Sequence, residues 1–101
     1  GTVTFSLVGS DPGCKINDIS IPLDRSGITD ADLLADSMGG ATNLQQILRL
    51  NPDRQGYDSW LPGAGYGFVD GAYVTEPFEV RIGHPYAACL KSGADGMSWP
   101  Q

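Results

Sequence analysis

The chain has 101 residues, and we expect residues 1–101 to form one domain around a single hydrophobic core. Hydrophobic residues make up 41% and charged residues 18%, which excludes intrinsic disorder, while 14 Gly and 7 Pro favour many tight turns between short strands. The net charge of −6 argues against a nucleic-acid partner and against an anionic membrane surface, because both are bound through clustered Lys and Arg.

Two strands are predicted in the first part of the chain. In Thr2–Val8 apolar and polar residues alternate, which is typical of a half-buried strand. A turn rich in Gly and Pro separates this segment from a second strand, Cys14–Pro22. Ile16 and Ile19 cannot share a face of that strand at a period of two. Either a bulge lies near Asn17-Asp18 or one of the two isoleucines is exposed.

The only helix signal covers Ile28–Met38. We expect Thr29 to cap its N-terminus, and two Asp residues in the first turn suit the positive end of the helix dipole. Gly39-Gly40 ends the helix. The helix has about three turns at most and is therefore expected to plug one end of a sheet. Its apolar side is formed by Leu33, Leu34 and Met38.

A β-hairpin is predicted in the middle of the chain, with strands at Leu44–Leu50 and Tyr57–Leu61. The pattern of Leu44–Leu50 alone fits either a helix or a strand. The turn Asn51–Gly56, which contains Pro and ends in Gly, favours the strand. A six-residue turn fixes the register of the two strands. It pairs Leu50 with Tyr57, Arg49 with Asp58, Leu48 with Ser59 and Ile47 with Trp60.

This register divides the hairpin side chains into two sets. One face carries Leu48, Leu50 and Tyr57, and the other carries Ile47, Arg49, Asp58 and Trp60. Because a charged pair is expected to face water, we predict that the second face is the wet one. Trp60 is then presented to solvent.

The rest of the chain adds a loop and three strands. Pro62–Gly71 is rich in glycine and is expected to be a loop. Phe78–Ile82, Tyr86–Lys91 and Met97–Trp99 are predicted strands. About seven short strands and one short helix, with turns every 8–12 residues, predict an all-β fold, an antiparallel β-sandwich.

Aromatic residues give the most informative functional signal. A Trp on a solvent-facing side of a sheet indicates a binding site for a partner. Sugar rings stack on such side chains through their C–H faces, while neighbouring polar groups bind the hydroxyls. We therefore expect a ligand surface at Trp60, with Asp58 and Arg49 beside it.

Three more aromatic residues are candidates for this surface. Tyr66 and Tyr73 flank the glycine-rich loop, and they either extend the surface or pack down as ordinary loop aromatics. Trp99 either joins the surface or fastens the last strand. The other large aromatics are expected in the core: Phe5, Phe78, Tyr57 and Tyr86.

The two cysteines, Cys14 and Cys89, are either buried thiols or one disulfide that joins an early strand to a late one. The extracellular character of the composition and the strand context of both residues favour the disulfide. The chain begins without a signal peptide, so we expect a mature or excised domain of a secreted protein.

The excess of Asp over Glu suggests calcium, because hard cations are bound by oxygen ligands. Asp24, Asp30 and Asp70 are the candidate ligands, although solvated Asp residues in turns would give the same composition. Catalysis is not expected. His84 lies in a turn between Gly and Pro, and Glu76 and Glu79 fall on opposite faces of an extended segment, so neither a triad nor a carboxylate pair is indicated.

Four motifs carry a resemblance: Asn17-Asp-Ile-Ser-Ile-Pro-Leu23, Arg49-Leu-Asn-Pro52, Gln55-Gly-Tyr-Asp-Ser-Trp-Leu-Pro-Gly63 and Gly83-His-Pro-Tyr86. From Cys14 to Leu90 the chain resembles a β-rich module appended to secreted bacterial proteins. It is most similar to a carbohydrate-binding module of a bacterial cellulase, in the family numbered 81. The resemblance implies a β-sandwich that binds β-glucans, with calcium involved and a parent glycoside hydrolase domain. Its functional residues cannot be aligned position by position.

Together these observations predict a secreted, monomeric, non-catalytic module that binds β-glucan chains of the cellulose type by aromatic stacking on an exposed sheet face. The alternative is a structural or adhesive module of a bacterial cell-surface protein, without a sugar ligand. A flat aromatic strip on one sheet face would distinguish the two. An enzyme would instead need a cleft with two opposed carboxylates.

Overall fold

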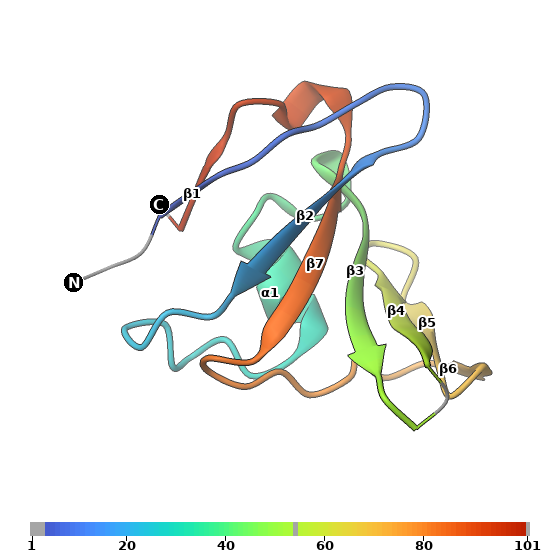
Figure 1. Cartoon of the computed structure of the whole chain (residues 1–101). Coiled ribbons are helices and arrows are strands. Elements are labelled where there is room, and N and C mark those ends of the chain that lie inside the picture. The colour runs from blue at the N-terminus through green and yellow to red at the C-terminus, as the bar shows by residue number, and fades with distance from the viewer. Residues whose placement is uncertain (1–3, 54, 101) are drawn as a thin grey trace.

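The computed structural model describes residues 4–53 and 55–100, and most of the regular structure within them is β (Figure 1). Antiparallel strands form two sheets, with one short helix and two 3-10 turns. This is the all-β, antiparallel class that the sequence predicts. The elements are β1 (Phe5–Ser6), β2 (Lys15–Ser20), α1 (Ala31–Asp36), β3 (Leu44–Asn51), β4 (Gly56–Leu61), β5 (Tyr66–Val69), β6 (Ala72–Val74), β7 (Pro85–Leu90) and β8 (Ser98–Trp99), with 3-10 turns at Gly40–Thr42 and Ser92–Ala94.

The larger sheet has six strands in the order β2-β7-β3-β4-β5-β6, and the smaller sheet pairs β1 with β8. β2 and β7 are far apart in the sequence but lie side by side, with Ile16 opposite Cys89. At this end of the pair, Cys14 and Cys89 form a disulfide, with their Cα atoms 5.2 Å apart. The predicted disulfide is confirmed, and it covalently links the start of β2 to β7.

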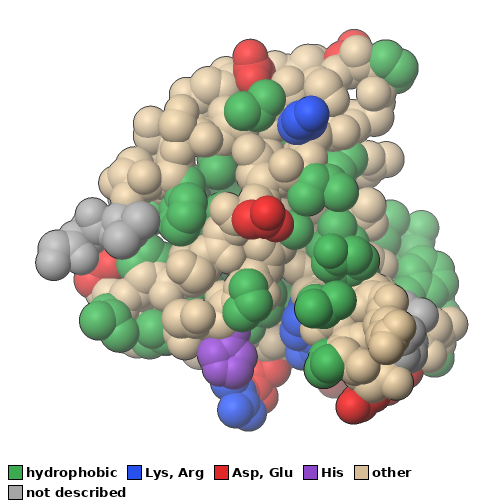
Figure 2. Space-filling view, viewed as in Figure 1, with side chains coloured by type: hydrophobic (Ala, Val, Ile, Leu, Met, Phe, Trp, Pro, Cys, Tyr) green, Lys and Arg blue, Asp and Glu red, His purple; other side chains and the backbone are tan. Residues whose placement is uncertain are grey.

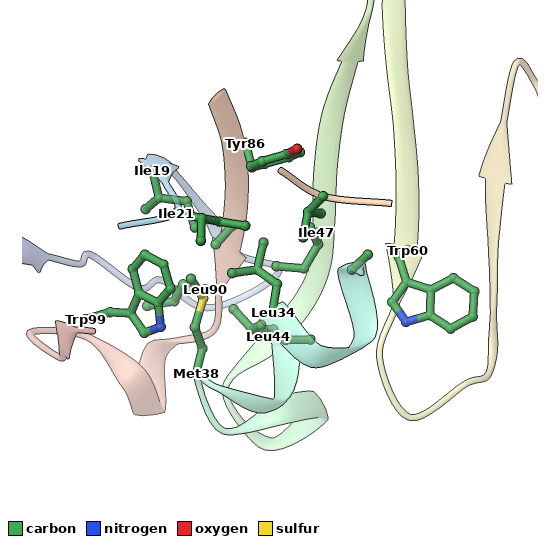
Figure 3. Close-up of a cluster of buried hydrophobic side chains, with 14 of the residues drawn as sticks. Ile19, Ile21, Leu34, Met38, Leu44, Ile47, Trp60, Tyr86, Leu90 and Trp99 are labelled. Carbon is green, nitrogen blue, oxygen red and sulfur yellow. The ribbon is translucent and has the colours of Figure 1, made fainter. Parts of the chain in front are cut away.

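One face of the six-stranded sheet, called here the inner face, is covered by α1 and by the β1–β8 sheet. In Figure 1, α1 lies behind β7. The core forms between these layers. It joins Ile19, Leu44, Ile47, Tyr86 and Leu90 of the large sheet to Leu34 and Met38 from the helix region and Trp99 of β8 (Figure 3). The opposite, outer face is turned to solvent. Among the described residues, no helix is both long and apolar enough to cross a membrane.

Helix α1 is shorter than predicted, and its cap is different. The side chain of Asp30, not Thr29, accepts a hydrogen bond from the N–H of Leu33 at 2.8 Å. The carbonyl of Thr29 is used elsewhere, by the N–H of Val80, so the chain is still extended at that point. Leu33 is 42% exposed, so its assignment to the apolar side is wrong. The buried side follows helical spacing and consists of Ala31, Leu34, Ala35 and Met38.

The alternatives for the second predicted strand are resolved in favour of an exposed isoleucine. β2 pairs with β7 without interruption at Asn17-Asp18, so no bulge is present there. Ile19 is buried at 4% exposure, whereas Ile16 points outward at 57%.

Two other predicted strands are shorter or absent. β1 is confined to Phe5–Ser6, and residues 2 and 3 of the predicted strand lie outside the described residues. Phe78–Ile82 is not a strand but makes isolated bridges at Glu79 and Ile82. Its alternation still places Phe78 and Val80 in the core.

Candidate ligand-binding surface

The β3–β4 hairpin has the predicted register but the opposite orientation. Arg49 lies opposite Asp58, as predicted. However, Asp58 and Trp60 are only 1% and 3% exposed, whereas Leu50 and Tyr57 are 54% and 56% exposed. The predictions that Trp60 faces solvent and that Tyr57 lies in the core are therefore both wrong. The Trp60 ring has no open face on which a sugar could stack.

The charged pair can be buried because several N–H groups donate hydrogen bonds to the Asp58 carboxylate and replace those of water. It accepts hydrogen bonds from Arg49 Nε at 3.1 Å and Nη2 at 2.7 Å, from Asn51 Nδ2 at 3.2 Å, and from the backbone N–H of Asp70 at 3.0 Å. Asn51 also donates to the carboxylate of Asp70 at 2.6 Å. This network ties β3 and β4 to the turn that follows β5.

The same network keeps Asp58 charged. Burial alone would raise the pKa of this carboxyl, because it disfavours the charged form. Hydrogen bonds from Arg49, from the Asp70 N–H and from Asn51, together with the positive charge of Arg49, outweigh burial. They hold the pKa of Asp58 below its ordinary value of 3.8.

Both tryptophans are buried and connected to the region of helix α1. The indole N–H of Trp60 donates to Asp32 Oδ1 at 3.0 Å, and that of Trp99 donates to Ser37 Oγ at 3.0 Å. Trp99 is fully buried and stacks on Phe5, with ring centroids 6.1 Å apart. Of the two alternatives for Trp99, fastening the last strand is the one that the structure supports.

The glycine-rich segment Pro62–Gly71, predicted to be a loop, contains β5 and the turn that joins it to β6 in a second hairpin. Its turn, Asp70-Gly71, has positive φ at both residues (54° and 77°), as a two-residue type I′ turn requires. Gly67 belongs to β5 for a steric reason, since a Cβ there would collide with the carbonyl of Ser59 and with Trp60. Glycine here permits close strand packing and does not mark a loop.

This second hairpin carries a cluster of three aromatic rings. Tyr66 and Tyr73 are stacked, with centroids 5.4 Å apart, and Phe68 meets them edge-on at 6.0 and 6.2 Å. Phe68 and Tyr73 are 40% and 62% exposed. Together with Tyr57 on the adjacent β4, these residues form what we call the aromatic strip: Tyr57, Tyr66, Phe68 and Tyr73.

The aromatic strip is part of a wider apolar outer face. Residues directly opposite one another in antiparallel strands project from the same face. One row across the sheet therefore contains Tyr73, Phe68, Ser59, Leu48, Ala87 and Asp18, of which Leu48 and Ala87 are buried. Leu50 and Ile16, both more than half exposed, project from the same face. Figure 2 shows hydrophobic side chains along β3 and at the right-hand edge, where β4–β6 lie. Exposed apolar patches of this kind are typical of interaction surfaces.

The six ligand residues predicted from the sequence are divided between two sides of the sheet. Tyr66 and Tyr73 lie on the outer face. Asp58, Trp60 and Trp99 are buried, and Arg49 extends from the inner side with its side chain 31% exposed. The sequence analysis missed Tyr57 and Phe68. The Asp70-Gly71 pair between alternating aromatic segments is a hairpin signal that predicts the position of Phe68 opposite Tyr73.

The three candidate calcium ligands lie apart. Asp24 is 4.0 Å from Arg25, Asp30 caps α1, and Asp70 accepts from Asn51. In residues 4–53 and 55–100, no group of three or more His, Cys, Asp or Glu side chains could hold a metal ion. These residues do not assemble the oxygen ligands that calcium takes. Calcium therefore stays a prediction based on composition and resemblance.

Comparison with known protein families, with curated proteins and with solved structures finds no match to this chain.

Proposed function

We propose that the chain is a non-catalytic module that binds polysaccharide on its outer face, with β-glucan chains of the cellulose type as the ligand. The observation that carries this proposal is the aromatic strip. Four aromatic side chains from three adjacent strands lie on one solvent-facing side of the sheet, and three of their rings contact one another.

The arrangement suits an extended sugar chain. Neighbouring strands of a sheet lie about 4.8 Å apart, so rings on β4, β5 and β6 offer consecutive apolar contacts across the strands. The rings of Tyr66, Phe68 and Tyr73 support one another and need little reordering on binding, which favours affinity. Ser59 and Asp18, in the same row of the outer face, supply polar groups for sugar hydroxyls.

The disulfide supports the part of the proposal that concerns location. Disulfides persist in oxidising compartments, so the Cys14–Cys89 bond fits a secreted module, and we propose from the resemblance that its parent is a glycoside hydrolase. The alternative, an adhesive module, would use the same apolar face to dock a protein. Exposed Ile16 and Leu50, which extend the face beyond the aromatic strip, are the observation that favours this alternative.

Affinity electrophoresis tests the proposal. Native gels would contain mixed-linkage β-glucan, hydroxyethylcellulose or no polysaccharide, and each would be run with calcium and with chelator. We expect retardation in the glucan gels relative to the plain gel. Equal mobility in all gels would contradict the proposal and favour the adhesive alternative. A chelator effect on retardation would report on calcium separately.

A further inference from the structure

Two hollows that share Tyr86 as a lining residue lie where β3 and β7 separate. The pairing of these strands ends at Leu48 and Ala87, and Tyr86 stands in the gap beyond it. The first hollow, about 180 Å³, opens beside the aromatic strip and is lined by Tyr57, Leu50 and Pro85, among others. The second, about 280 Å³, is lined by Arg49, Glu79, Arg81, His84 and Tyr86. Tyr86 lines both hollows, the first together with outer-face residues and the second together with Arg49.

The second hollow gathers basic side chains in an acidic protein, and each of its arginines has an acidic partner, Asp58 for Arg49 and Glu79 for Arg81. The chain has 6 Lys and Arg residues and 1 His against 12 acids, yet two of the arginines and the only histidine meet here. Glu79 is the acidic residue of the lining, and it pairs with Arg81 at 2.7 Å. Both partners are more than half exposed, so this pair is weak and can rearrange. Figure 2 shows Lys, Arg and His side chains at the lower end of the outer face.

Arg49, which lines this hollow, is held by several contacts. Two of its nitrogens donate to Asp58, Nη1 donates to the carbonyl of Glu79 at 3.2 Å, and its guanidinium lies 4.5 Å from the centre of the Phe78 ring. These bonds engage three of the five N–H groups of an arginine, and the side chain is still 31% exposed. A fixed guanidinium with N–H groups to spare is suited to bind a carboxylate.

We infer that the second hollow is a carboxylate subsite, and that the β-glucan chains bound by this module include units oxidised at C6 to glucuronic acid. The inference rests on the proposed function, since the sugar ring is placed against Tyr57 in the first hollow. Its C6 carboxylate then reaches Arg49, Arg81 and His84. Asp18 lines the first hollow, and its charge opposes a carboxylate there, which directs the acid group to the second.

The test compares two oligosaccharides that differ only at C6: a β-1,4-linked glucan chain and the same chain oxidised to glucuronic acid. Isothermal titration calorimetry at low salt should give affinity about tenfold higher for the oxidised chain, the value expected of one charge-assisted hydrogen bond. The difference should shrink at high salt, because exposed charges are screened.

Two exposed variants report on the subsite in opposite directions. Arg81→Gln should remove about half or more of the preference for the oxidised chain, while affinity for the neutral chain stays the same. Glu79→Gln should increase the preference, because it releases Arg81 from its pair. Lys15→Gln is the matched control, since it removes the same charge from an exposed residue outside both hollows and should have no effect.

The outcomes separate the two claims. Equal affinity for the two chains, or equal effects of Arg81→Gln and Lys15→Gln, would overturn the carboxylate subsite and leave the aromatic strip intact. Failure of both chains to bind would overturn the proposed function and the subsite with it.

Discussion

Arg49 and Asp58 lie opposite each other on β3 and β4, and their ion pair, 2.7 Å between Nη2 and Oδ2, is directed to the inner side of the sheet. Successive residues of a strand project from opposite faces. Because Asp58 is buried, its neighbour Tyr57 projects from the outer face. Leu50, which pairs with Tyr57, projects from the same face. The aromatic strip and the buried ion pair are two consequences of one hairpin orientation.

Asp58→Ala should destabilise the protein strongly. It leaves the partly buried Arg49 without its carboxylate and removes the acceptor used by Asn51 and the Asp70 N–H. Loss of one partner of a buried pair costs about 3–5 kcal/mol. Urea unfolding measures the change, and Asp36→Ala, at an exposed helix position, is the control. Equal stability of the two variants would show that the network contributes little.

Acid should weaken the fold through the same residue. The pKa of Asp58 is lowered in the folded state, whereas an unfolded Asp has a pKa of about 3.9. The stabilisation is therefore complete above the unfolded pKa and is lost as the pH falls through the folded pKa. The unfolding free energy should decrease below about pH 4, and less steeply in Asp58→Asn. Parallel pH profiles of the two proteins would refute this assignment.

Trp60→Ala and Tyr73→Ala should differ in stability. Trp60 is 3% exposed, and truncation of a buried Trp costs about 3–5 kcal/mol. Tyr73 is 62% exposed, so its loss should cost no more than about 1 kcal/mol, the value of a ring contact on an open face. Thermal and urea unfolding of both variants measure the two losses of stability. Similar losses would mean that the burial of the two rings does not differ as described.

The sequence predicts those parts of the fold that depend on local pattern. Alternation and turn length gave the register of the β3–β4 hairpin, and strand context favoured the disulfide. The orientation of the hairpin could not be predicted this way, because it depends on partners of Asp58 that come from other elements. Asp70, which supplies one N–H, lies 12 residues further along, in a turn that looked like part of a loop. The role of Gly67 is likewise visible only once Ser59 and Trp60 lie beside it.

The Cys14–Cys89 disulfide should contribute substantially to stability. Its cysteines are 75 residues apart. In the chain-entropy model, closing a loop of that length lowers the entropy of the unfolded chain and stabilises the folded state by about 4 kcal/mol. The Cys14→Ala, Cys89→Ala double variant should unfold at lower urea concentration than the parent protein. A thiol titration of the denatured, unreduced protein should find no free thiol. Two free thiols would contradict the cross-link.

Calorimetric titration of Tyr73→Ala with a soluble β-glucan tests whether the aromatic strip binds the polysaccharide. Truncation of a central aromatic commonly costs about 2 kcal/mol of binding free energy, so affinity should fall about thirtyfold with little change in melting temperature. Leu23→Ala, at a residue that is 85% exposed and outside the outer face, is the control and should bind normally. Unchanged affinity of Tyr73→Ala for a glucan that the parent protein binds would contradict binding at the aromatic strip.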